Sequence, residues 1–120
     1  MKLHLDRIQL NNIQRYDNES IVIHEKSYNQ SLIVMSDYLS DWDVNGFDDL
    51  ELAHFKRLQA LQPELVILGT GLQQQFPDPQ LCNPLIEARI GLEVMDRFAA
   101  CRTYNILVAE GRKVLAALIF

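Results

Sequence analysis

The sequence predicts an α/β fold: a single domain over residues 1–120, built as three layers around a mixed β-sheet. Short β-type runs fill the first half of the chain, whereas the second half alternates helical and strand-like segments. Such alternation favours parallel strands joined by right-handed helical crossovers. The chain has 120 residues, of which 48% are hydrophobic and 22% are charged, so it can bury one core.

The first half is predicted to form an antiparallel β portion. Residues 13–16 and 20–23 are short strand-like runs separated by a turn composition, and residues 31–35 form a third strand. Ser36 and Asp37 end that third strand. Because the connections are short, antiparallel hairpins are favoured over parallel pairs.

A helix is predicted next, beginning near Asp48 and Asp49 and ending before Pro63. Its apolar stripe recurs every three residues, at Leu52, Phe55, Leu58 and Leu61. Polar residues fill the other face, and among them we expect His54 to be solvated.

The second half is predicted to hold three further strands and two helices. Residues 65–68 are a continuous apolar run before glycines, typical of a strand buried on both faces. A helix over 81–88, restarted at Pro84, leads to a second short buried strand at 92–95. The helix over 97–110 is apolar nearly all round, so we expect it to be central. Residues 113–120 form the last strand.

Composition and charge exclude several classes of function. The net charge is −5 and no basic stripe is visible, which argues against nucleic-acid binding. No apolar run approaches the ~20 residues of a membrane span, and the first ten residues resemble neither a signal nor a transit peptide, so a cytoplasmic location is expected. Cys82 and Cys101 lack metal-ligand spacing, so neither a metal nor a cofactor is expected, and we expect no disulfide.

A candidate ligand site lies at the turn Gly69-Thr70-Gly71, at the carboxyl end of a predicted buried strand. Asp96 begins the following helix, whose free N–H groups suit an anion. If the two strands are neighbours, these residues share one crevice. The turn matches no dinucleotide or P-loop motif, and the alternative interpretation is a tight turn beside a helix cap.

Polar residues interrupt the apolar helix that Asp96 begins. Arg102, Thr103 and Asn105 need partners if they are buried, either in a structural network or on a ligand. No complete catalytic motif of a common enzyme class is present, so the chain is predicted not to be an enzyme.

Four segments together resemble one known family: residues 63–71 followed by Phe76-Pro77, residues 90–96, residues 99–107 and residues 110–119. They are similar to the Mth-type domain of unknown function, the family of the mitochondrial complex I assembly factor three. The resemblance implies a three-layer α/β fold, no established enzyme activity, and protein partners at a membrane surface. It also makes candidate pocket residues of its motif positions, namely Gly69, Thr70, Gly71, Arg102, Thr103, Tyr104 and Asn105.

Two functional hypotheses follow. The first is a non-catalytic interaction protein, an assembly factor for a membrane-associated respiratory complex, which binds a protein partner and can associate with the membrane through that partner. It predicts an exposed apolar patch near Trp42 or Phe76-Pro77. The second is a small-ligand or anion-binding module that uses the Gly69 to Gly71 turn and the helix start at Asp96.

Overall fold

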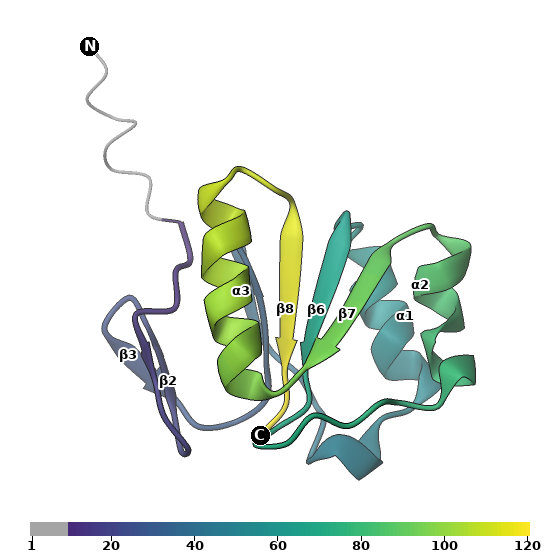
Figure 1. The fold of residues 1–120 in the computed structure, drawn as a ribbon, viewed down its shortest axis with the longest axis horizontal. Helices are drawn as coiled ribbons and strands as arrows, with labels where there is room; N and C mark the ends of the chain where they lie inside the picture. Colours follow the sequence, from purple (N-terminus) through teal and green to yellow (C-terminus); the bar gives the residue numbers. More distant parts are fainter. Residues whose placement is uncertain (1–9) are drawn as a thin grey trace.

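The computed structural model describes residues 10–120 and contains two β-sheets flanked by helices (Figure 1). The smaller sheet is antiparallel, in the order β1-β2-β3, and its strands are Arg15–Tyr16, Ile21–Ile23 and Lys26–Tyr28. The predicted antiparallel β portion of the first half is therefore confirmed.

The larger sheet has five strands in the order β5-β4-β8-β6-β7. Its strands are β4 (Leu32–Met35), β5 (Tyr38–Asp41), β6 (Leu65–Gly69), β7 (Gly91–Met95) and β8 (Val114–Leu118). β6 runs parallel to β7 and β8, whereas β4 runs antiparallel to β5 and β8. The mixed sheet with parallel strands from the second half is thus confirmed.

Helices cover both faces of this sheet, which makes three layers (Figure 1). The helices are α1 (Leu52–Ala60), α2 (Asn83–Glu87) and α3 (Arg97–Ala109), with short 3-10 turns at Phe47–Asp49 and Pro79–Cys82. Alternate residues of β4 show the layering: Ile33 and Met35 pack with α1, whereas Leu32 and Val34 pack with α3 and the small sheet. All five residues of β8 are buried, so this strand is the centre of the core.

Two strands were not predicted, and each follows a two-residue turn. β3 pairs with β2 across His24 and Glu25, whose φ angles are 52° and 65°. Such turns favour Asn and Gly, so a histidine and a glutamate give no local hairpin signal. β5 pairs with β4 across Ser36 and Asp37, which were predicted only to end a strand.

The predicted start of α1 is wrong. Asp48 and Asp49 lie in the 3-10 turn, and Glu51 caps the helix instead. His54, expected to be solvated, is only 8% exposed. Its Nδ1 accepts the N–H of Glu51 at 2.9 Å and its ring stands edge-on to Trp42, so it completes the cap and packs inward.

Two predictions of burial are also wrong. β7 was expected to be buried, but it is one of the two outer strands of the sheet and its residues are exposed or half-buried. α3 was expected to be central because it is apolar nearly all round, yet it buries only one side, and Ile106 is 59% exposed. Both elements therefore have apolar side chains that are not buried in the core and that lie partly at the surface.

Candidate functional site

The turn after β6 and the start of α3 lie together, as the sequence predicted. The N–H of Thr70 donates to the carbonyl of Met95 at 2.9 Å, and the N–H of Arg97 donates to the carbonyl of Gly71 at 2.7 Å. Thr70, Gly71 and Asp96 therefore share the edge formed by the carboxyl ends of β6 and β7. Gly71 has φ of 101°, a conformation that suits glycine.

The polar groups of this turn already have partners within the chain. The hydroxyl of Thr70, which is 3% exposed, donates to the carbonyl of Gln73 at 2.7 Å and accepts the N–H of Gln75 at 3.0 Å. Asp96 accepts the N–H of Ala99 at 2.9 Å as the cap of α3. A Cβ at Gly69 would lie 2.9 Å from the Cβ of Ala100, so the glycine serves close packing of helix on strand.

The other candidate residues follow one another along α3. Tyr104 is fully buried and its hydroxyl donates to the carbonyl of Asn11 at 2.7 Å. Asn105 exchanges two hydrogen bonds of 2.9 Å with the backbone of Ile13. Thr103 is half-buried, and Arg102 is exposed at the surface of the helix.

Tyr104 and Asn105 thus hold the segment before β1 against α3. The Tyr104 contact spans 93 positions of the sequence and the Asn105 contact spans 92. They form a structural network of the kind that polar residues on a packed helix require. Burial raises the pKa of the Tyr104 phenol, so its hydroxyl stays protonated as a donor.

Arg97 is a buried charge that the sequence analysis did not single out. It is 2% exposed, and its guanidinium donates to the carbonyls of Ile119 at 3.1 Å and Asn18 at 2.7 Å. The same group stacks on the ring of Phe120, 3.8 Å from its centroid. Burial lowers the pKa of Arg97, while Cys101 and Asp17 oppose that change. The sequence signal that could have marked Arg97 is its position in the first turn of a helix, directly after the end of a strand.

The cysteines are buried, free thiols. Burial raises the pKa of Cys82, and it raises that of Cys101 to about 12. Neither is a nucleophile near neutral pH. No group of three or more metal-ligating side chains lies close enough to hold a metal ion within residues 10–120, and no helix of this part of the chain is long and apolar enough to cross a membrane.

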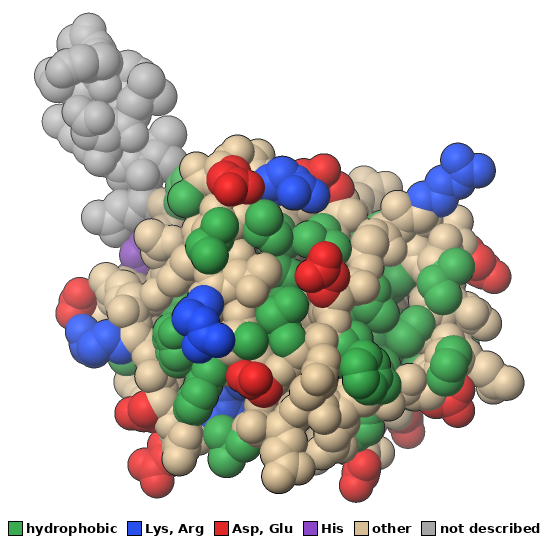
Figure 2. Space-filling view, in the orientation of Figure 1, with side chains coloured by type: hydrophobic (Ala, Val, Ile, Leu, Met, Phe, Trp, Pro, Cys, Tyr) green, Lys and Arg blue, Asp and Glu red, His purple; other side chains and the backbone are tan. Residues whose placement is uncertain are grey.

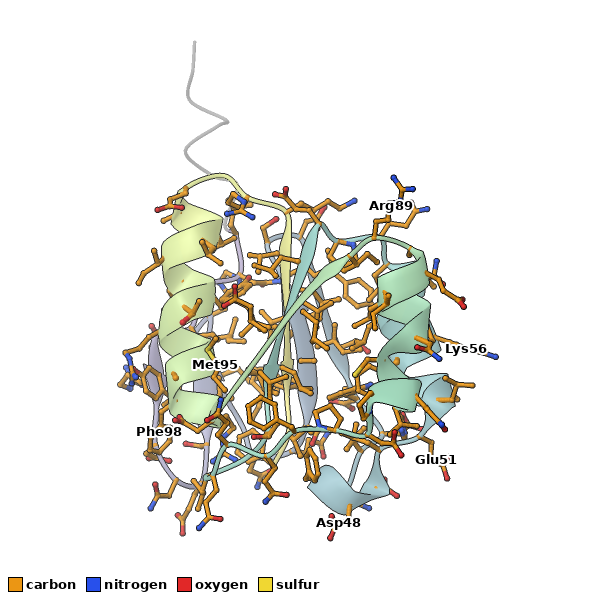
Figure 3. The ribbon with its side chains drawn as sticks, turned by 45° about the vertical axis from the view of Figure 1, so that its right-hand side comes forward. Asp48, Glu51, Lys56, Arg89, Met95 and Phe98 are labelled. Atoms are coloured by element: carbon orange, nitrogen blue, oxygen red, sulfur yellow. The ribbon has the colours of Figure 1, made fainter. Side chains whose placement is uncertain are left out.

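Partly exposed apolar side chains lie along β7 and the segment after β6. Leu92, Val94 and Met95 are half-buried on this strand, and the segment after β6 adds Leu72 and Phe76, which are 60% and 72% exposed. Figure 2 shows hydrophobic side chains over β7, between α3 and α2. Figure 3 shows Met95 at the end of β7 beside the first turn of α3, which carries Phe98.

Trp42, the other residue predicted to mark an exposed patch, lies inside. It is 3% exposed and belongs to the core cluster that contains α1. Trp42 therefore anchors its loop, and the exposed apolar surface is the one at Phe76.

Comparison with known proteins places the chain in a family. The model of a protein of unknown function (DUF498/DUF598) matches residues 13–119. The chain belongs to this DUF498/DUF598 family. The family resemblance drawn from the sequence segments is thereby confirmed, and a solution structure of a Bordetella pertussis protein, described as a Mth938-like domain, superimposes with a TM-score of 0.81 at 26% identity.

Two relatives have descriptive names. The chain is 26% identical over 108 residues to a 13 kDa major membrane protein of Francisella tularensis, which covers 88% of both chains. It is 28% identical over 120 residues to the NADH dehydrogenase [ubiquinone] 1 alpha subcomplex assembly factor 3 of Xenopus tropicalis, covering 98% of this chain and 66% of that one. The chain thus spans just under two thirds of the assembly factor.

Solved structures from bacteria share the whole fold. A crystal structure from Bordetella parapertussis has a TM-score of 0.87 at 32% identity, covering 92% of this chain and 96% of that one. An NMR structure from Xanthomonas campestris has a TM-score of 0.81 at 38% identity, covering 91% and 83%.

Proposed function

We propose that this member of the DUF498/DUF598 family is a non-catalytic interaction protein that assists the assembly of a membrane-associated respiratory complex. The observation that carries the proposal is the exposed apolar surface beside β7, where Leu72 and Phe76 are 60% and 72% exposed. Apolar side chains gathered in this way on a folded chain are typical of a surface that binds another protein.

The relatives supply the kind of partner. One is named an assembly factor of NADH dehydrogenase and another a major membrane protein. No helix of residues 10–120 can cross a membrane. We therefore propose that this chain reaches the membrane by binding a membrane-associated protein.

A capture experiment from native cells tests the proposal. Tagged wild-type chain, a Phe76→Asp variant and a Leu52→Asp control are crosslinked in cells and purified, and bound proteins are quantified by mass spectrometry. Leu52 is also an exposed leucine, 41% exposed, but it lies on α1. We expect wild type and control to retain the same stoichiometric partner from the membrane fraction, and Phe76→Asp to lose it. No stoichiometric partner, or equal capture by all three, contradicts the proposal.

The anion-binding alternative stays a separate proposal for the residues Thr70, Gly71 and Asp96, which the fold brings together. Inorganic phosphate is its simplest probe. A rise in melting temperature with millimolar phosphate that disappears in Thr70→Val supports it, whereas an unchanged melting temperature contradicts it.

A further inference from the structure

The backbone of β7 has one side without a neighbouring strand. Gly91 donates its N–H to the carbonyl of Glu64 at 3.1 Å, and the carbonyl of Met95 accepts the N–H of Thr70 at 2.9 Å. The two backbone groups of a strand residue point to the same side, and this side alternates along the strand. Gly91, Glu93 and Met95 therefore point to β6, and Leu92 and Val94 point outward.

The side chains of the outward residues lie on one face of the sheet. Leu92 and Val94 pack against the core cluster of α1 and α2, whereas Met95 packs against that of α3. Glu93 lies between them on the α3 side of the strand and is exposed. An added strand would extend both apolar layers, and on the α3 face of the sheet it would meet the carboxylate of Glu93.

A single side chain reaches the outward backbone of β7 in the described part of the chain. Nε2 of Gln74 donates to the carbonyl of Val94 at 2.9 Å. Gln74 is exposed, and its neighbours Leu72 and Phe76 extend the apolar surface beside the strand. The edge thus offers two N–H groups, one free carbonyl and an apolar border.

Charge determines which strand fits this edge. In an antiparallel pair of two β7 strands, Leu92 would oppose Val94 of the second copy and the two Glu93 residues would face each other. Like charges directly opposite destabilise a pair, whereas opposite charges stabilise it. Glu93 has no ion pair within residues 10–120, and the chain has a net charge of −5. The edge therefore disfavours a second copy and favours a basic strand.

We propose that β7 is the docking strand for an extended segment of a partner protein, which adds to the sheet with apolar residues beside Leu92 and Val94 and a lysine or arginine facing Glu93. This inference rests on the proposed interaction function and gives it a binding mode. Hydrogen bonds between the two backbones fix the register of the added strand, and Leu72 and Phe76 contact it from beside β7.

Amide NMR of the full chain tests the inference with synthetic peptides. The probe is a blocked nonapeptide of alternating valine and threonine with a central Val-Lys-Val. One comparator carries Val-Glu-Val, and a second has N-methylated backbone amides at both central valines. We expect the amides of Leu92 and Val94 to shift with the lysine peptide, about tenfold weaker binding of the glutamate peptide, and no binding of the methylated one.

Two variants make the test specific to the backbone. Val94→Pro removes the outward N–H, a position where an edge strand tolerates proline, and Val94→Thr keeps it. We expect Val94→Pro to bind the lysine peptide about tenfold more weakly than Val94→Thr, the factor of one hydrogen bond. Amide signals of β8 check the fold, and if Val94→Pro unfolds, the methylated peptide decides alone.

The outcomes separate this inference from the proposed function. Shifts remote from β7, equal binding of the lysine and glutamate peptides, or shifts that depend only on protein concentration overturn the docking strand; the last would indicate a second copy. Undiminished capture of the cellular partner by Val94→Pro also overturns it while leaving the interaction function intact. Peptide binding at β7 without any cellular partner would contradict the interaction function and leave the docking strand standing.

Discussion

The two outer strands of the five-stranded sheet, β5 and β7, differ in the side chains that hold them in place. Nδ2 of Asn11 donates to the carbonyls of Met35 and Tyr38, at 2.9 Å and 3.0 Å, where β4 turns into β5. At the other end of β5, Nη1 of Arg57 donates to the carbonyl of Asp41 at 3.1 Å. β7 has the single bond from Gln74, as far as residues 10–120 show.

The covering groups also differ in burial. Asn11 is 9% exposed and Arg57 is half-buried, whereas Gln74 is exposed. When a buried donor moves away, its acceptor stays without a hydrogen bond. When an exposed donor moves away, water takes its place. On β5 the outward carbonyl of Asp41 is held by half-buried Arg57, whereas on β7 that of Val94 is held by exposed Gln74, so β7 is the edge more open to another chain.

The largest expected effect is a change of association state. Glu93→Thr removes the charge in the middle of β7 while keeping a strand-forming residue, so two copies lose their main repulsion. We expect wild type to be monomeric and Glu93→Thr to dimerise, measured by sedimentation equilibrium at micromolar concentrations. Asp41→Thr makes the same kind of change on β5 and should stay monomeric. Association of both variants, or of neither, would remove the difference between the edges.

Loss of the buried clip at β5 should cost the most stability. Asn11→Ala removes two side-chain hydrogen bonds at the turn between β4 and β5, and we expect the free energy of unfolding to fall by about 2–3 kcal/mol, measured by urea denaturation. The control is Asn12→Ala, at an exposed neighbouring asparagine, which should change stability by less than about 0.5 kcal/mol. Equal effects of the two variants would show that Asn11 does not hold the turn between β4 and β5.

The Arg57 clip should have a smaller effect that depends on pH. Arg57→Ala removes the bonds to Ser40 and Asp41, and we expect a loss of about 1 kcal/mol near neutral pH. The Arg57 guanidinium, helped by Ser40, holds the pKa of the Tyr38 phenol below its usual value of 10.0. This phenolate contribution is fully present above pH 10.0 and is lost as pH falls through the lowered pKa.

Ring-carbon NMR of the tyrosines measures this titration directly. In Arg57→Ala we expect the Tyr38 signal to titrate at higher pH than in wild type. Arg112→Ala removes an arginine that pairs with Glu64 instead, so the Tyr38 titration should be unchanged. A Tyr38 pKa that does not respond to either variant would contradict the role of Arg57.

The second half of the fold could be predicted because its elements carry strong local signals. The apolar run of β6 ends at a glycine, and Asp96 caps α3 where the sequence places it. β3 could not be predicted, since it is an exposed strand of three residues after a turn without Asn or Gly. Local patterns mark the type of an element, but they do not mark its order in a sheet.

The candidate site divides in the same way. The approach of Thr70 and Gly71 to Asp96 was predictable, because the carboxyl ends of parallel strands meet at one edge. The partners of Tyr104 and Asn105 were not, since they lie more than 90 residues earlier in the chain. The position of β7 at the end of the sheet also depends on which strands pair across the chain, and local patterns do not encode this pairing. The open edge of β7 is therefore visible only in the fold.

The smallest expected effect is at the clip on β7 itself. Gln74→Ala removes one exposed hydrogen bond to Val94, and we expect stability to change by less than about 0.5 kcal/mol. Binding of the lysine peptide should be unchanged or up to about threefold tighter, because the carbonyl of Val94 is no longer occupied. Gln75→Ala is the control, since its side chain makes no hydrogen bond within residues 10–120. A loss of stability as large as that of Asn11→Ala would show that β7 is held as firmly by Gln74 as β5 is by Asn11.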